Sequence, residues 1–231
     1  MKSLIKKLDW DSAFFDIKIG EITLNEDLSI DALLDFDLVV VKQLNDFKVS
    51  INSFTEAFQE TKVTFSKKIT HQTTNDKSLI FDTDECPINE KDLFELAYES
   101  GKYSRFLLDT HFKEDDFKKL YEKWVINSLN KKFADKVFYL KTNDSILGFI
   151  TIKKNDMTTA TIGLIAVAEN RQGMGFGSDL LKKAEDYCYN EKIIELRIPT
   201  QKENLLACKF YAKMGYDVLE NLIIKHFWKV K

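Results

Sequence analysis

The first third of the chain alternates between apolar and polar residues in short runs, the pattern of half-buried strands. It predicts strands over Lys18–Leu24, Leu38–Leu44, Val63–Thr70 and Ser78–Phe81. Short helices are expected between them, around Ile30–Leu34 and Asn52–Phe58. An acidic, turn-prone stretch at Asp82–Pro87 follows and predicts a domain boundary.

Beyond Pro87 the apolar spacing becomes that of amphipathic helices, at Asn89–Tyr98 and Glu114–Leu129. The second helix carries one apolar stripe, formed by Phe117, Leu120, Tyr121, Trp124, Val125 and Leu129. Short turn-like gaps then separate three strand-like runs, which predict an antiparallel meander over Val137–Lys141, Ile146–Lys153 and Thr158–Ala168. The remaining pattern predicts a helix at Gly177–Tyr189, a strand at Ile193–Ile198, a helix at Leu205–Met214 and a final run at Tyr216–Trp228. This order predicts a mixed α/β protein, of the α+β type, with a smaller N-terminal subdomain over 1–86 and a larger domain over 87–231.

Composition limits the classes of function. The 231 residues suffice for one large domain or two small ones, and 44% hydrophobic with 31% charged residues is ordinary for a soluble protein. A net charge of −3 gives no bias toward nucleic acid or a membrane surface as partner. No run approaches the roughly 18 apolar residues of a membrane span, and the first residues lack the apolar core of a signal peptide. We therefore expect a cytoplasmic protein that is not inserted into a membrane.

The cysteines and histidines do not indicate a metal site. Cys86, Cys188 and Cys208 are an odd set without Cys-x-x-Cys spacing, and the last two occupy apolar helix positions, which favours packing over a nucleophile. The three histidines are scattered, without the spacing of metal ligands, so no metal is expected.

The glycines are concentrated in one place. Three of the eight, Gly173, Gly175 and Gly177, fall within five residues between a predicted strand and a predicted helix. This order exposes unpaired backbone N–H groups at a helix N-terminus, where an anion fits.

Several kinds of anion site compete for this turn. A Walker-type loop is excluded because the lysine and the serine or threonine that it needs are absent from the required positions. A dinucleotide fingerprint is weak because Ser178 stands where the last glycine belongs, and because the preceding strands look antiparallel. A glycine turn that merely starts a helix remains open.

A third motif fits better. Gln172-Gly-Met-Gly-Phe-Gly177 matches Gln/Arg-x-x-Gly-x-Gly/Ala, the coenzyme A pyrophosphate motif of the GNAT N-acetyltransferases, which the chain resembles. Downstream, Asn204-x-x-Ala207-x-x-x-Tyr211-x-x-x-Gly215-Tyr216 resembles the second signature of the family. The resemblance implies a GNAT fold, with a mixed, centrally splayed sheet flanked by helices. It also implies that the N-terminal subdomain is a smaller, degenerate GNAT-like half.

The resemblance also implies the residues of the site, with acetyl-CoA as co-substrate. The pantetheine arm would enter between Thr161–Ala168 and Ile193–Ile198. Cofactor-binding residues would be Ile165, Ala166, Val167, Gln172, Gly173, Met174, Gly175, Phe176, Gly177, Ser178 and Asn204. Tyr211 would be the catalytic residue, donating a proton to the departing thiolate.

Further segments resemble the dTDP-fucosamine acetyltransferase subgroup of the family, namely Leu8–Phe15, Ser104–Phe106 and Tyr121–Ser128. This implies a small-molecule amine as partner, such as a dTDP-linked amino sugar. Arg105 could then pair with a substrate phosphate, although a helix cap or a surface salt bridge is an equal alternative. Tyr121 and Trp124 could wall a sugar or base pocket, although such a stripe is more often core.

The expected reaction is transfer of an acetyl group from acetyl-CoA to a primary amine. A protein N-terminus or a polyamine is an alternative acceptor, and a non-catalytic coenzyme A-binding module is an alternative function. No general base can be assigned, and a homodimer is left open.

Overall fold

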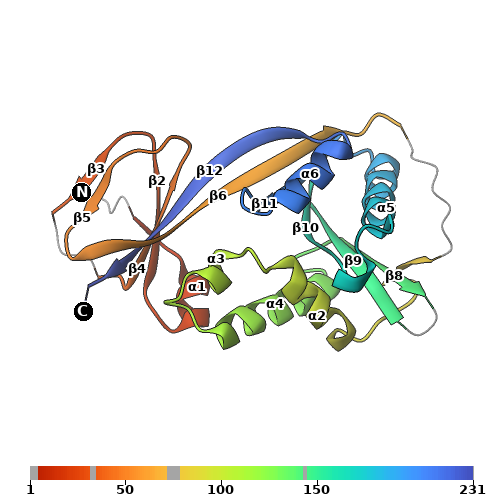
Figure 1. Cartoon of the computed structure of the whole chain (residues 1–231), viewed down its shortest axis with the longest axis horizontal. Helices are drawn as coiled ribbons and strands as arrows, with labels where there is room; N and C mark the ends of the chain where they lie inside the picture. The colour runs from red at the N-terminus through yellow and green to blue at the C-terminus, as the bar shows by residue number, and fades with distance from the viewer. Residues whose placement is uncertain (1–4, 32–34, 72–78, 143–144, 231) are drawn as a thin grey trace. The chain divides into compact units, whose positions relative to one another are not determined.

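The computed structural model describes residues 5–31, 35–71, 79–142 and 145–230 (Figure 1). The chain forms two compact units. The first comprises the residues up to Val63, Gln201–Glu203 and the chain from Glu220 onward, and the second comprises Thr64–Thr200 and Asn204–Leu219.

The first unit is a small sheet with its own core. Its elements are β1 (Lys6–Lys7), α1 (Asp9–Phe15), β2 (Ile19–Leu24), β3 (Leu28–Ile30), β4 (Leu38–Gln43), β5 (Val49–Ile51) and parts of β6 (Phe54–Lys68) and β12 (Asp217–Lys229). Strand β4 pairs in parallel with β2 and antiparallel with β12, and β3 with β5 forms a separate parallel pair. Apolar side chains from these strands form one core, with Ile22, Val39, Val41, Ile51 and Phe227 among its buried members.

The second unit holds the larger part of the chain. Its helices are α2 (Lys91–Ser100), α3 (Arg105–Leu108), α4 (Glu114–Leu129), the short 3₁₀ helix η1 (Glu169–Arg171), α5 (Phe176–Asn190) and α6 (Leu205–Lys213). Its strands β7 (Ile80–Asp82), β8 (Lys136–Thr142), β9 (Ser145–Lys154), β10 (Thr159–Val167) and β11 (Glu195–Gln201) lie in the order β11-β10-β9-β8-β7. The predicted antiparallel meander is confirmed in β8, β9 and β10, and β11 pairs in parallel with β10. The expected mixed sheet flanked by helices is thereby confirmed.

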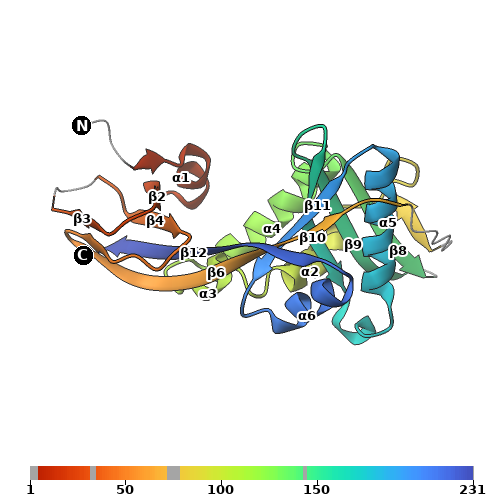
Figure 2. The same cartoon turned by 90° about the horizontal axis from the view of Figure 1, so that it is seen from above.

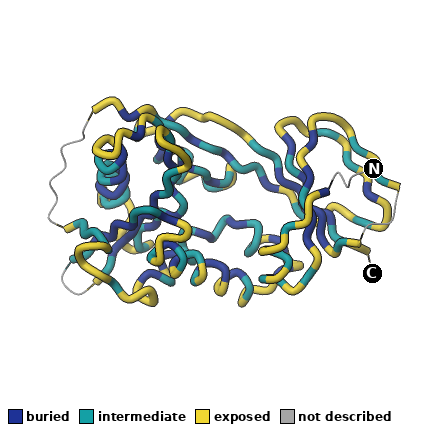
Figure 3. Tube along the Cα trace, turned by 180° about the vertical axis from the view of Figure 1, so that it is seen from behind, coloured by how far each residue is buried: buried dark blue, intermediate teal, exposed yellow. Residues whose placement is uncertain are grey.

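Helices cover both faces of β8–β10 (Figure 2). A Cβ on Gly148 would lie 3.1 Å from Leu180 of α5, whereas Thr151, three residues along β9, lies beside Gly163 on the side of Trp124 in α4. Because side chains alternate along a strand, α5 and α4 pack on opposite faces. Helix α5 is buried along part of its surface and exposed along the rest (Figure 3). Its fully buried residues include Leu180, Leu181, Ala184 and Cys188, which confirms the packing role predicted for Cys188.

Some predicted elements differ from the structure. The helix predicted at Asn52–Phe58 is wrong, because Ser53 has a φ of 64° in a tight turn that leads directly into β6. Of the helix predicted around Ile30–Leu34, Ile30 is the last residue of strand β3, and residues 32–34 lie outside the described residues. Ser78 of the strand predicted at Ser78–Phe81 also lies outside them. The first unit ends at Val63, inside β6, so this long strand contributes residues to both units. The assignment of 1–86 as a degenerate GNAT-like half therefore stays a prediction.

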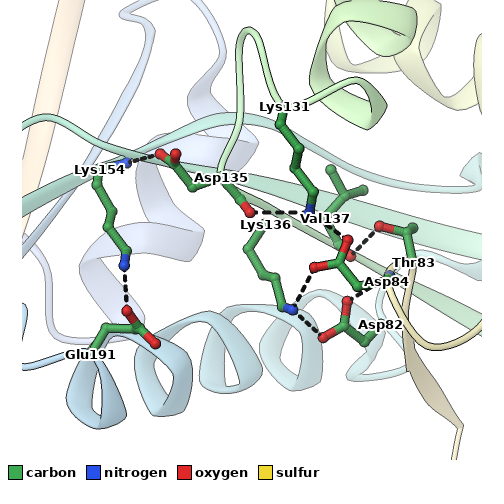
Figure 4. Close-up of polar contacts among 9 residues, drawn as sticks. All are labelled: Asp82, Thr83, Asp84, Lys131, Asp135, Lys136, Val137, Lys154 and Glu191. Carbon is green, nitrogen blue, oxygen red and sulfur yellow. Dashed lines mark hydrogen bonds and ion pairs between the residues drawn. The ribbon is translucent and has the colours of Figure 1, made fainter.

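An ionic cluster holds the edge strand β7 (Figure 4). Lys136 on β8 contacts Asp82 at 2.5 Å and Asp84 at 2.8 Å, and Lys131 contacts Asp84 at 2.5 Å. On the other side of β8, Asp135 accepts a hydrogen bond from the backbone N–H of Lys154, the last residue of β9. Since Asp82 and Lys136 are both largely buried, this pair is screened less by solvent than a surface pair.

Replacing Lys136 tests the cluster. We expect Lys136→Met to lower the free energy of unfolding by about 1–3 kcal/mol, because Asp82 would keep a mostly buried carboxylate without its cation. The matched control is Lys118→Met, which removes an exposed pair with Glu114 and should leave the free energy of unfolding nearly unchanged. Urea unfolding at neutral pH measures both, and equal effects would contradict the role of Lys136.

Acid should weaken the same cluster. Hydrogen bonds from Lys131 and Lys136 lower the pKa of Asp84 below its ordinary value of 3.8. The stability that Asp84 contributes is therefore fully present above pH 3.8 and is lost as the pH falls through its lower folded-state pKa. Urea unfolding as a function of pH should show a smaller acid loss in Lys136→Met than in the parent chain.

Candidate active site

The glycine turn between β10 and α5 adopts a conformation that favours glycine. Gly173 has a φ of 76° and Gly175, the N-cap of α5, has a φ of 88°, both in the left-handed region. A Cβ at either position would meet no atom within 4 Å. The glycines therefore serve the backbone conformation and leave open space beside it.

This turn presents a group of backbone donors. The first N–H groups of a helix have no partner within the helix, and here Asp179 is the first to bond back, to the oxygen of Gly175 at 3.1 Å. Among the described residues, no acceptor bonds the N–H groups of residues 173–178. Because α5 is 15 residues long, its dipole adds partial positive charge at the same end. The turn can therefore hold an anion such as a diphosphate.

The residues around the turn differ in how far they are exposed to solvent. A Cβ on Gly177 would lie 3.4 Å from Phe210 of α6 and 3.8 Å from Val167 of β10, which are ordinary contact distances, so the start of α5 lies beside both elements. Met174 is 59% exposed, whereas Phe176 and Ser178 are half-buried.

Pairing between β10 and β11 ends early. Three residue pairs join the strands, from Thr159 with Glu195 to Thr161 with Arg197. Ile165, Ala166 and Val167 pair with β9 on the other side of β10, and within the described β10 and β11 they have no partner in β11. Main-chain groups next to the glycine turn are thus left available to a ligand.

A bulge accompanies this opening. The register of β10 against β9 shifts between Ile162 and Ile165, and the N–H of Leu164 donates to Thr151 Oγ1 at 2.8 Å. Sequence reasoning missed both the bulge and Thr151. The signal was available, because an isolated glycine such as Gly163 inside a strand often marks a bulge.

Two polar residues expected to bind the cofactor also hold protein structure. Gln172 Nε2 donates to the carbonyl oxygen of Val167 at 3.2 Å and to Glu99 Oε1 at 3.3 Å, which joins the glycine turn to the end of α2. Asn204 caps α6, because its Oδ1 accepts from the N–H of Ala207 at 3.2 Å.

Tyr211 lies on α6 and is 5% exposed. Its ring packs against those of Phe65, Phe210 and Tyr216, with centroids 5.5–6.5 Å apart. Burial raises the pKa of this phenol above its ordinary value of 10, so it stays protonated at neutral pH. A protonated phenol can act as a proton donor.

Arg105, Tyr121 and Trp124 lie in three different settings. Arg105 opens α3, and its guanidinium stacks 4.7 Å from the ring centre of Phe106. Tyr121 is buried, and its ring packs so tightly against Gly101 that a Cβ on Gly101 would lie 2.4 Å from the ring. Trp124 is half-buried, and its Nε1 would lie 3.6 Å from a Cβ on Gly163, next to the bulge of β10. Of the three, only Trp124 is placed beside β10 by these contacts.

The described residues form neither a metal-binding cluster nor a membrane-spanning helix. In the ranges that the structure describes, no three His, Cys, Asp or Glu side chains gather to hold a metal ion. No helix among them is long and apolar enough to cross a membrane.

Known proteins are similar in sequence to this chain over much of its length. The model of the Acetyltransferase (GNAT) family matches residues 94–216. The chain is 23% identical over 225 residues to dTDP-fucosamine acetyltransferase from Escherichia coli O6:H1, covering 94% of this chain and 95% of that protein. It is 25% identical over 145 residues to the spore coat polysaccharide biosynthesis protein SpsD from Bacillus subtilis, where the match covers 63% of this chain but only 50% of that protein.

Solved structures support the fold. A GNAT-family protein from Novosphingobium aromaticivorans superposes with a TM-score of 0.55 at 8% identity, covering 87% of this chain and 78% of the other. The matched residues 94–216 include most of α2, the glycine turn and Tyr211. The chain belongs to the GNAT family of acetyltransferases.

Proposed function

We propose that this N-acetyltransferase transfers an acetyl group from acetyl-CoA to the primary amine of a nucleotide-linked amino sugar. The observation that carries the cofactor assignment is the group of N–H donors at residues 173–178, which no described residue bonds, beside main-chain groups of β10 that β11 does not pair. The acceptor class rests on the similarity to dTDP-fucosamine acetyltransferase over 94% of the chain.

In this proposal the glycine turn holds the pyrophosphate of coenzyme A. The N–H groups of Gly173, Met174, Gly175, Phe176, Gly177 and Ser178 supply the donors. Space is available because the two left-handed glycines carry no side chain. Main-chain groups of Ile165–Val167 align the pantetheine arm. Asn204, which caps α6, also contacts this arm.

The residues of the chain contribute to the reaction in two ways. Backbone N–H groups near Val167 stabilise the negative charge that develops on the thioester oxygen when the neutral amine attacks. A nitrogen–carbon bond forms, the carbon–sulfur bond breaks, and Tyr211 donates its phenolic proton to the departing sulfur. Because burial raises the pKa of Tyr211, the phenol holds this proton throughout the neutral range. The proton lost by the amine passes to water, and a proton from water restores the phenol of Tyr211.

Two residues are proposed to face the acceptor. Trp124 lies beside the bulge of β10, on the face of the strand opposite α5, and offers an aromatic surface to a sugar or a base. Arg105 offers a guanidinium to a phosphate of the nucleotide. Tyr121 contributes by packing α4 against Gly101, and its ring lies beside that of Trp124.

The glycine turn can be tested with a pair of matched variants. We expect Gly175→Ala to weaken coenzyme A binding at least about tenfold, because a Cβ would enter the space beside the donors and the backbone would resist a φ of 88°. The control is Gly215→Ala, which has a φ of 82° just after the C-cap of α6 and carries the same backbone strain. Titration calorimetry with coenzyme A should show the loss in Gly175→Ala only; equal losses would remove the turn from the binding site.

The catalytic role of Tyr211 predicts a loss of turnover without a loss of binding. Tyr211→Phe keeps the packing against Phe65 but removes the proton, so kcat should fall about 100-fold or more with coenzyme A affinity unchanged. In the parent chain kcat should decline only as the pH rises beyond 10, since the raised pKa moves ionisation of the phenol upward.

The matched control is Tyr139→Phe. Tyr139 is also buried with a raised pKa, but its hydroxyl donates to Cys86 O, away from α6. Its kcat should match that of the parent chain. Turnover that survives in Tyr211→Phe would exclude Tyr211 as the proton donor.

The acceptor class can be measured by thiol release from acetyl-CoA. A dTDP-linked 4-amino sugar should give a kcat/KM at least about 100-fold above that of a polyamine or of a peptide N-terminus. A higher value for one of those amines would replace the proposed acceptor. Tight coenzyme A binding without thiol release on any amine would favour a non-catalytic module.

A further inference from the structure

A buried ionic network lies outside the residues proposed to contact either substrate. Glu185 of α5 is 2% exposed, yet both of its oxygens accept from Lys67 Nζ, at 2.9 and 3.0 Å. Tyr216, also 2% exposed, donates its hydroxyl hydrogen to Glu185 Oε1 at 3.0 Å. Strand β6, helix α5 and the residue that precedes β12 meet at this one carboxylate.

The same lysine also holds the end of α6. Lys67 Nζ donates to the carbonyl oxygen of Met214, the C-cap of that helix, at 3.1 Å. The cation therefore sits at the negative end of the helix dipole, where it is stabilised.

The end of α6 connects this contact to Tyr211. The helix closes in a Schellman motif, in which the N–H of Tyr216 donates to Tyr211 O at 3.0 Å and the N–H of Gly215 donates to Ala212 O at 3.0 Å. Gly215 supplies the left-handed residue that the motif needs, with a φ of 82°. The ring of Tyr216 also packs 6.5 Å from that of Tyr211.

An ion pair formed by a buried carboxylate and a mostly buried lysine, 24% exposed here, contributes little to stability alone. Removing two charges from water costs about as much as their attraction returns, and apolar residues of similar size often stabilise a core as well. Fixed distances and several simultaneous hydrogen bonds instead make such a group directional. The burial of Tyr216, together with the charge of Glu185, raises the pKa of its phenol and keeps it a donor.

We propose that Lys67, Glu185 and Tyr216 are positioning residues that set the place of the Tyr211 hydroxyl relative to the glycine turn. The turn begins α5 and Glu185 lies ten residues after its N-cap, about 15 Å along the same rigid helix. Tyr211 is tied to that helix through Met214 and Tyr216. The inference rests on the proposed function, in which Tyr211 donates the proton.

The test compares kinetics with stability in the full-length chain. Lys67→Met should lower kcat about tenfold, while coenzyme A affinity stays within about twofold. Lys67→Arg keeps the cation and should retain at least about half of the parent kcat. The matched control is Lys154→Met, which breaks an ion pair with Glu191 at the far end of α5 and should leave kcat unchanged.

A double-mutant cycle separates positioning from mere structure. In a Tyr211→Phe background, Lys67→Met should cause no further loss of kcat, because the group that it positions is already gone. A tenfold loss that persists in this background, or an unchanged kcat in Lys67→Met alone, would overturn the proposal. A lower melting temperature with normal kcat is the result of a purely structural network and would also overturn it.

Two further variants keep the outcomes distinct. If Lys67→Met does not fold, Tyr216→Phe removes a single hydrogen bond to Glu185 and should lower kcat about fivefold in the parent chain but not in Tyr211→Phe. If Tyr211→Phe itself leaves kcat unchanged, the proposed proton donor fails. If Tyr211→Phe lowers kcat and the network variants do not, only the positioning role fails.

Discussion

The parallel pairing of β10 with β11, and its early end, is the constraint on which the second unit depends. Three pairs fix the register of the two strands, and β10 then continues with its hydrogen bonds directed to β9 alone. The bulge at Gly163 and Leu164 shifts the register of β10 against β9, and Thr151 accepts from the N–H of Leu164, which the bulge would otherwise leave unbonded. Without this opening the glycine turn would keep its unbonded N–H groups, but no unpaired main-chain groups of β10 would lie beside it.

The elements of the second unit could be predicted from sequence because their signals are local. The helix predicted at Glu114–Leu129 agrees at both ends with α4, whose acidic first turn and apolar stripe mark it clearly. The glycine turn was predictable for a similar reason, since a cluster of glycines directly before an amphipathic helix is typical of an anion site at the helix N-terminus.

The remaining features depend on contacts between distant parts of the chain. Phe54 and Phe58 are four residues apart, a spacing that a helix and a long strand can both use, and only the turn at Ser53 decides for the strand. The network of Lys67, Glu185 and Tyr216 joins residues more than 100 positions apart, so no window of sequence contains it. Gln172 was identified by its motif, but its bonds to Glu99 and Val167 come from tertiary packing.

The short strand β7 has a consequence beyond the stability of its ion pairs. It covers β8 through three residues, Ile80 to Asp82, and ends in the acidic segment that Lys131 and Lys136 hold. An uncovered β8 would offer a row of apolar residues with open backbone donors and acceptors, the template on which chains associate edge to edge. A brief strand closed by charge is a poor template. The charges at Asp82 and Asp84 therefore make this edge of the sheet a poor place for a second chain to add a strand.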